Sequence, residues 1–399
     1  MERGRVPLAK PFTLLIALAL ALACSLVLVQ SARAQSFKVL HDFTGGADGA
    51  NPLNGLMMGA SGYMYGTASA GGTYNNGTVF RIGSAGAVKV VYAFKGGTDG
   101  ASPQSSLIED SAGRLYGTTS AGGTYGGGTV FRIVDSKETI LYNFGSGSDG
   151  SSPLGGLTFD SAGNLYGTTS AGGANGNGTV FMISPSGKTW KETILYSFGT
   201  GTDGAIPYAG VALDSAGDVL GTTSAGGADG YGTIFQLTKA DSWAESIVYN
   251  FENQNDGAVP YAGLIADGHG NFYGAATEGG SQEGGSIFEL TPSGTTWNFT
   301  AIQSVPGWGI SGTFRNVMLS SSGTIYATTH CDGSYDAGTV YELVPGGGGV
   351  WNYTLLYTFT GGTDGLYSYS NLVMVKNKLY GTTNLGGTYG DGVVFAVTP

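Results

Sequence analysis

A short phrase that in most copies ends in Gly-Thr recurs along the chain, and this repeat limits the available folds more than any other feature. Its lead residue occurs seven times, at intervals of 51, 50, 54, 53, 53 and 54 residues. The leads are Tyr65, Tyr116, Tyr166, Leu220, Tyr273, Tyr326 and Tyr380. Units that recur at such a period bury their apolar faces against their neighbours, which predicts a repeat architecture.

Each unit contains four short β-rich runs, which we call A to D in chain order. In one copy they cover residues 157–160, 164–169, 179–183 and 193–198, and no helical period is present. The A–B link is the hairpin turn Asp-Ser-Ala-Gly at residues 110–113, 160–163 and 214–217. Because the runs are apolar on both faces, we predict stacked sheets that form a seven-bladed β-propeller of four-stranded antiparallel blades. A parallel β-helix is the alternative, but its coils recur every ~20–25 residues.

The two ends of the chain complete each other. Residues 38–43 form a D-type run with no A, B or C before it, and residues 393–397 form a C-type run with no D after it. We therefore predict that the N-terminal strand pairs with the last blade and closes the ring, which removes exposed sheet edges. In such a meander the D–A and B–C loops share one face, and the A–B and C–D turns share the other.

The first 34 residues have the layout of a secretory signal peptide. Basic residues precede an apolar stretch, and Ala32-Arg33-Ala34 ends it. We predict cleavage after Ala34, one propeller domain over residues 35–399, and a secreted, periplasmic or cell-surface location without a stable membrane anchor. Lipidation at Cys24 and an uncleaved anchor are alternatives.

The predicted mature chain is strongly acidic. Loss of residues 1–34 removes four basic residues and one acidic residue, which changes the net charge from −11 to −14. Such a surface repels phosphate backbones, so nucleic acid is not expected as a partner. Cys331 is then the single remaining cysteine, which excludes an intramolecular disulfide framework.

The repeat phrase resembles a known family. Most copies contain, in order, Phe-x-Gly-Gly-x-Asp-Gly-x-x-Pro, Asp-Ser-Ala-Gly-x-Leu-Tyr-Gly-Thr-Thr-Ser-x-Gly-Gly and Gly-Thr-Val-Phe, with some variation between copies. This composite phrase is similar to the GloVer tandem repeat of bacterial exported proteins, over nearly all of residues 40–399. The resemblance implies a surface or secreted protein with a C-terminal anchor, and no particular reaction. Here the chain ends at Pro399, directly after the last strand, so we expect release rather than attachment.

An aspartate recurs in the D–A loop of every copy except the sixth. The six are Asp48, Asp99, Asp149, Asp203, Asp256 and Asp364. Acid–base catalysis needs carboxylates in different environments, and a repeated setting supplies no such asymmetry. We predict structural carboxylates that accept backbone N–H bonds in their own turns, rather than catalytic or metal-binding groups.

The residues that differ between copies are better candidates for binding. Four B–C loop tyrosines occur in copies that ring closure makes contiguous, and Trp308 replaces the Asp-Gly phrase in copy six. The predicted ligand-binding set is Tyr74, Tyr125, Trp308, Tyr335 and Tyr389. Copy six also carries His330-Cys331-Asp332, but adjacent residues in extended chain point apart, so no catalytic nucleophile is predicted. Three scattered histidines suggest no metal site and no cofactor.

The leading hypothesis is a binding or interaction propeller that recognises a glycan or a protein through this aromatic arc. One alternative is a polysaccharide hydrolase or lyase with carboxylates near the central channel. Another is a structural component of the cell envelope. The sequence leaves the oligomeric state open.

Overall fold

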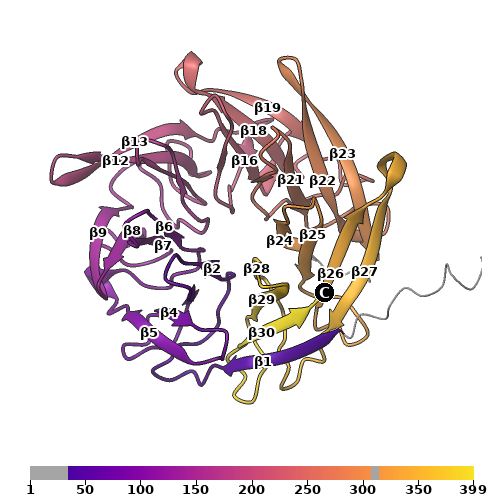
Figure 1. The fold of residues 1–399 in the computed structure, drawn as a ribbon. Coiled ribbons are helices and arrows are strands. Elements are labelled where there is room, and N and C mark those ends of the chain that lie inside the picture. Colours follow the sequence, from indigo (N-terminus) through magenta and orange to yellow (C-terminus); the bar gives the residue numbers. More distant parts are fainter. Residues whose placement is uncertain (1–34, 307–313) are drawn as a thin grey trace, which may run out of the picture.

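Seven four-stranded antiparallel sheets are arranged in a ring in the computed structural model, which describes residues 35–306 and 314–399 (Figure 1). This confirms the predicted seven-bladed β-propeller. In blades 1 to 6 the strands follow chain order from the central axis to the rim, and in blade 7 the outermost strand is the N-terminal strand of the chain. In the part of the chain described, no helix is long and apolar enough to cross a membrane.

The first four blades use consecutive segments of the chain. Blade 1 contains β2 (Met57–Met58), β3 (Met64–Ala68), β4 (Thr78–Ile82) and β5 (Val88–Ala93); blade 2 contains β6 (Ile108–Glu109), β7 (Leu115–Thr119), β8 (Thr129–Val134) and β9 (Lys137–Asn143). Blade 3 contains β10 (Thr158–Phe159), β11 (Leu165–Thr169), β12 (Thr179–Ser186) and β13 (Thr189–Ser197); blade 4 contains β15 (Ala212–Leu213), β16 (Val219–Thr223), β18 (Thr233–Thr238) and β19 (Ala244–Asn250). The ribbon β14 (Gly204–Ala205) with β17 (Ala225–Gly226) links two loops of blade 4.

The last three blades complete the ring. Blade 5 contains β20 (Ile265–Ala266), β21 (Phe272–Ala276), β22 (Glu283–Ser293) and β23 (Thr296–Pro306); blade 6 contains β24 (Phe314–Leu319), β25 (Ile325–Thr329), β26 (Thr339–Pro345) and β27 (Trp351–Thr358). Blade 7 contains β28 (Val373–Val375), β29 (Lys378–Thr383), β30 (Val393–Thr398) and β1 (Ser36–Asp42). Three single 3₁₀ turns, η1 (Gly97–Asp99), η2 (Lys239–Asp241) and η3 (Gly347–Gly349), lie in connections.

The N-terminal strand closes the ring, as predicted. β1 pairs antiparallel with β30, from Ser36 opposite Thr398 to Asp42 opposite Val393 (Figure 1). Phe37 of β1 stacks on Tyr357 of blade 6, with ring centroids 3.7 Å apart. The last blade therefore joins the two ends of the chain and packs against its neighbour as the other blades do.

The core consists of layers between blades rather than one central mass. The second strand of each blade is buried along its whole core segment, as the residues Leu165–Thr169 of β11 illustrate. A phenylalanine that follows the fourth strand, such as the buried Phe144, packs on the third strand of the next blade, where its ring centroid lies 4.9 Å from that of Phe181. Apolar surface on both faces of a sheet is what such stacking requires.

The A–B turns agree with the sequence prediction, whereas one C–D link differs from it. The Asp-Ser-Ala-Gly turns form as expected: Asp110 accepts the backbone N–H groups of Ala112 and Arg114, and Gly113 has φ +76°. The C–D link after the run 179–183 is shorter in the structure than the sequence runs indicate. β12 and β13 extend through this segment as a hairpin that projects from the rim, because Ser184 to Ser186 pair with Thr189 to Lys191.

Candidate functional site

A central cavity of about 610 Å³ lies where the first strands of all seven blades converge. Each blade contributes residues from the start of its A strand, so the cavity opens beside the D–A loops. The volume falls within the range of ~300–1,000 Å³ typical of small-ligand pockets. Representative lining residues, one from each blade in order, are Leu53, Gln104, Leu154, Tyr208, Tyr261, Met318 and Asn371.

One side of this cavity is aromatic. Tyr208 and Tyr261 each directly follow a loop proline, at the repeat position that Leu53 and Leu154 occupy in blades 1 and 3. Their rings form an edge-to-face pair with centroids 4.7 Å apart. This geometry holds the two neighbouring rings at the edge of the cavity, where a flat apolar ligand surface can pack on them.

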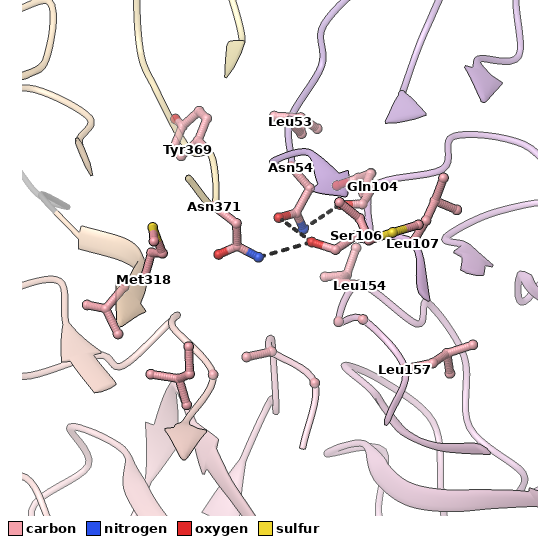
Figure 2. Close-up of a pocket in the computed structure, with 18 of the residues that line it drawn as sticks. Leu53, Asn54, Gln104, Ser106, Leu107, Leu154, Leu157, Met318, Tyr369 and Asn371 are labelled. Atoms are coloured by element: carbon pink, nitrogen blue, oxygen red, sulfur yellow. Dashed lines mark hydrogen bonds between the residues drawn. The ribbon is translucent and has the colours of Figure 1, made fainter. Parts of the chain in front are cut away.

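The side formed by blades 7, 1 and 2 is polar. Asn371 donates through Nδ2 to Ser106 Oγ at 3.1 Å, and Ser106 Oγ donates to Asn54 Oδ1 at 3.1 Å. Asn54 Nδ2 donates to the carbonyl oxygen of Gln104 at 2.9 Å. Figure 2 shows these side chains pointing toward one another across three blades. The network fixes the amide groups in one orientation, so a ligand need not order them on binding.

Glycine at position 55 permits the close approach of blades 7 and 1 beside this network. A Cβ atom added there would collide with the carbonyl oxygen of Asn371. The backbone contact explains why blade 1 has glycine at this position, just before its inner strand.

Tyr369 connects the cavity to the His330-Cys331 pair. Its hydroxyl is hydrogen-bonded to His330 Nε2, and the two rings stack with centroids 4.3 Å apart. The expectation that His330 and Cys331 point apart was wrong, because the chain leaves β25 at Thr329 and turns, and Cys331 Sγ lies 2.8 Å from His330 Nδ1. Burial, helped by the charge of Asp336, raises the pKa of the Cys331 thiol, whereas a nucleophilic cysteine needs a lowered one.

The predicted loop tyrosines lie on one face but outside the cavity. Tyr74, Tyr125, Tyr335 and Tyr389 are 51%, 59%, 63% and 61% exposed and belong to the contiguous blades 6, 7, 1 and 2. None of the four is among the residues that line the cavity. In blade 2 the B–C loop packs on the end of the outer strand, because Gly127 N–H donates to the carbonyl oxygen of Phe144. Trp308 lies outside the described residues.

The loop aspartates accept hydrogen bonds within their own loops. In five blades the carboxylate accepts both a backbone N–H four residues before it and a tyrosine hydroxyl seven residues before it, while Asp48 is bonded to His41 instead of a tyrosine. The tyrosine bonds are Tyr92 to Asp99, Tyr142 to Asp149, Tyr196 to Asp203, Tyr249 to Asp256, and Tyr357 to Asp364. Within residues 35–306 and 314–399, no group of three or more His, Cys, Asp or Glu residues is arranged to hold a metal ion.

One of these tyrosines also contacts an acid of the next blade. The Tyr142 hydroxyl lies 2.9 Å from Asp149 Oδ2 and 3.0 Å from Glu192 Oε2. A hydroxyl has one proton, so both contacts are hydrogen bonds only when one carboxyl group is protonated. Burial, and then the nearby Asp149 charge, raise the pKa of Glu192 to about 7, against the opposing hydrogen bond from Tyr142. Glu192 therefore carries the proton below neutral pH.

Burial, and to a lesser degree a neighbouring aspartate, likewise raise the pKa of Glu138 to about 8 and of Glu245 to about 7. These two acids occupy the same place on the outer strands of blades 2 and 4 as Glu192 does on blade 3. Three consecutive blade interfaces thus contain a carboxyl group that favours its neutral form.

These features define the class of the protein: a seven-bladed β-propeller with a ligand-sized cavity on its axis. Its chain belongs to the Gloeobacter/Verrucomicrobia repeat family, whose model matches residues 27–226 and 211–399. A comparison with curated protein sequences finds no match.

Solved structures with low sequence identity share the fold. An ulvan lyase of polysaccharide lyase family PL25, solved bound to -[GlcA(1-4)Rha3S]-, matches with a TM-score of 0.54 and 10% identity, over 89% of this chain and 95% of that chain. The extracellular domain of BT4673 from B. thetaiotaomicron, a protein assigned as a one component system, matches with a TM-score of 0.55 and 12% identity, over 90% of this chain and 42% of that chain. Identities this low show the fold alone.

Proposed function

We propose that this propeller is a binding module that recognises a neutral glycan segment at the D–A and B–C face, with a sugar unit in the central cavity. The observation that carries the proposal is the pairing, within one cavity, of the Tyr208–Tyr261 edge with the Asn371–Ser106–Asn54 network. Sugar rings present apolar C–H faces, which pack on aromatic rings, and hydroxyl groups, which exchange hydrogen bonds with amides.

The exposed loop tyrosines extend the same face outward. A polymer that enters the cavity must cross the loops around it, and Tyr74 and Tyr389 belong to the adjacent blades 1 and 7. In this proposal they add contact area to the outer units of the ligand, while the cavity determines which unit is recognised. The glycan bound to the ulvan lyase supports the idea that this fold can accept a polysaccharide.

The test is a glycan array followed by titration calorimetry on the best ligand. The double substitution Tyr208→Ala with Tyr261→Ala should weaken binding by about tenfold or more, because it removes both stacking rings. Tyr74→Ser with Tyr389→Ser should have a smaller effect. Tyr63→Ser is the matched control, because Tyr63 is a partly exposed tyrosine of the A–B turn on the other face.

Two results would contradict the proposal: no glycan bound by the wild-type protein, or equal losses in the cavity variant and the Tyr63→Ser control. Loss confined to the loop-tyrosine variant would move the site from the cavity to the rim. That outcome would favour a protein or glycan partner that contacts only the outer loops.

A polysaccharide hydrolase or lyase is the competing function. Its carboxylate pair was expected near the channel, yet none of the described residues that line the cavity is Asp or Glu. Among the acids outside the cavity, Asp332 of the blade 6 B–C loop has a pKa that is raised by burial and then by the Asp336 charge, against the Gly333 N–H bond. Product formation on a polysaccharide panel, abolished by Asp332→Asn, would support catalysis.

A further inference from the structure

A second cavity, of about 850 Å³, lies between blades 2 and 3 on the face formed by the A–B and C–D turns. This is the face opposite the D–A and B–C loops. Its walls are the A–B turns of both blades, around residues 109–114 and 159–163, and the projecting β12–β13 hairpin of blade 3. The proposed glycan site does not use any of these residues.

Cationic side chains gather at this cavity although the chain as a whole is acidic. Arg114, Arg132 and Lys188 all line it, in a chain with 17 basic residues and a net charge of −11. Trp190 and Phe159 form aromatic walls beside them, and the rings of both pack edge-on against Tyr116. Cations beside partly buried aromatic rings can bind a ligand that carries both an anionic group and an apolar surface.

The aspartates of the cavity already accept several hydrogen bonds from neighbouring groups. Asp110 accepts from Arg114 Nε at 2.5 Å and from the Tyr116 hydroxyl at 3.0 Å, and it also accepts two backbone N–H groups of its turn. Burial alone would raise its pKa, but these hydrogen bonds outweigh burial and lower it. Asp160 is bonded to its own turn in the same way.

The third acid, Glu109, accepts the Ala60 N–H of blade 1 at 2.7 Å. Of the three cations, only Arg114 has a carboxylate partner, since the ion pairs of the described chain include neither Arg132 nor Lys188. Both cations line the cavity without a carboxylate partner, so an anion that enters it can neutralise their charge.

A repeat-to-repeat comparison shows what Arg132 lacks. Between blades 4 and 5, Trp297 Nε1 donates to Gln236 Oε1 at 3.0 Å. Arg132 and Trp190 occupy the same strand positions between blades 2 and 3, opposite Tyr116 and Pro185 respectively. A guanidinium group is donor-only, so it cannot accept from an indole N–H. Arg132 Nε is buried with no hydrogen-bond partner, while the guanidinium group also forms a side-chain hydrogen bond with the Tyr116 hydroxyl.

Arg132 and Trp190 thus line a cavity that lacks the side-chain acceptor which Gln236 supplies between blades 4 and 5. We propose that this cavity binds an anionic sugar residue, whose carboxylate or sulfate ester accepts hydrogen bonds from Arg132 and Lys188 while its ring packs on Trp190. An oxyanion supplies the acceptor that Gln236 supplies between blades 4 and 5, and it does so with charge-assisted bonds. The site is separate from the central cavity and selects for negative charge.

The experiment is calorimetric titration of the folded protein with tetragalacturonate. Its fully methyl-esterified form is the uncharged control probe, and a sulfated galactan oligosaccharide is a second anionic probe. Wild-type protein should bind an anionic probe and bind the methyl ester at least about tenfold more weakly, because the ester loses the charge-assisted bonds. The carboxylated and sulfated probes then identify which anion is preferred.

Arg132→Gln is the decisive variant. It recreates the glutamine found at position 236, so it should fold and donate no charge-assisted bond, and its anion binding should fall by about tenfold or more. Arg81→Gln is the matched control, since Arg81 is the same repeat position in blade 1, where its guanidinium lies 4.3 Å from the Tyr63 ring centroid. Binding that survives Arg132→Gln, or that falls equally in Arg81→Gln, would overturn the site, as would equal affinity for the methyl ester.

Failure of this site is distinguishable from failure of the proposed glycan function. The Tyr208→Ala and Tyr261→Ala double variant should leave anionic-probe binding within about twofold of wild type, because it changes only the central cavity. Loss of anion binding in that variant would also overturn the proposal, since the anion would then be bound on the axis.

Discussion

Replacing Phe43 by alanine tests whether the N-terminal strand is an integral part of the ring. Phe43 directly follows β1 and is fully buried, and its ring centroid lies 5.2 Å from that of Phe80 in blade 1. Truncation of a buried phenylalanine costs about 3–5 kcal/mol. Unfolding entropy near 2.1 cal/mol/K per residue gives roughly 0.8 kcal/mol/K for a chain of this length, so Tm should fall by about 4–6 °C.

Phe144→Ala is the matched control for this measurement. Phe144 holds the same position in blade 2, is equally buried, and follows an outer strand that is continuous with its own blade. Thermal melts by circular dichroism should show similar falls for the two variants. An unchanged melt for Phe43→Ala beside a lowered one for Phe144→Ala would refute the closure. Deleting residues 35–43 should lower Tm further, because it also removes the β1–β30 ladder.

Three further changes test the packing and electrostatics of the blades. Because burial raises the pKa of Glu192 to about 7, the stability that this group contributes is complete below its ordinary pKa and is lost as pH rises through 7. Glu192→Gln should therefore raise the free energy of unfolding near pH 8 by about 1 kcal/mol, after allowance for solvent screening. A melting temperature at pH 8 no higher than that of the wild type would contradict this. Gly117→Ala places a Cβ 2.7 Å from Phe131 Cζ and should cost about 1–3 kcal/mol in urea denaturation, whereas an unchanged midpoint would mean that the ring moves aside freely. Asp149→Ala removes the acceptor of the Tyr142 hydroxyl and should cost about 1–3 kcal/mol in the same assay; a loss below about 0.5 kcal/mol would show that solvent replaces the bond.

The repeat made the fold predictable. A fixed period, four β-rich runs in each unit and complementary chain ends are properties of the sequence itself, and they determine a closed ring of blades. The errors lie where strand ends depend on neighbours. The runs 179–183 and 193–198 are shorter than the strands that form, because the hairpin continues to Ser186 and Thr189 through pairing partners that are close in the chain.

The candidate site was less predictable than the fold. The loop tyrosines were predicted because they differ between copies, whereas Tyr208 and Tyr261 were not predicted because copies four and five share the phrase Pro-Tyr-Ala-Gly. An alignment of the repeats could have identified them, since the residue after the loop proline lies a few residues before the innermost strand, on the approach to the axis. What it could not supply is which inner-strand residues meet across the axis, as Asn371 meets Ser106, because that depends on the radius of the ring.

The pairing of β1 with β30 has a consequence for how the molecule is made. Ser36 and Thr398 are joined side by side, so the first strand to leave the ribosome has no partner until the last one has been synthesised. Blades 1 to 6 can form one after another from local hairpins, whereas the seventh requires a contact that spans the whole domain. The ring therefore cannot close before the last strand has been synthesised, and a product truncated before that strand leaves the N-terminal strand without its partner.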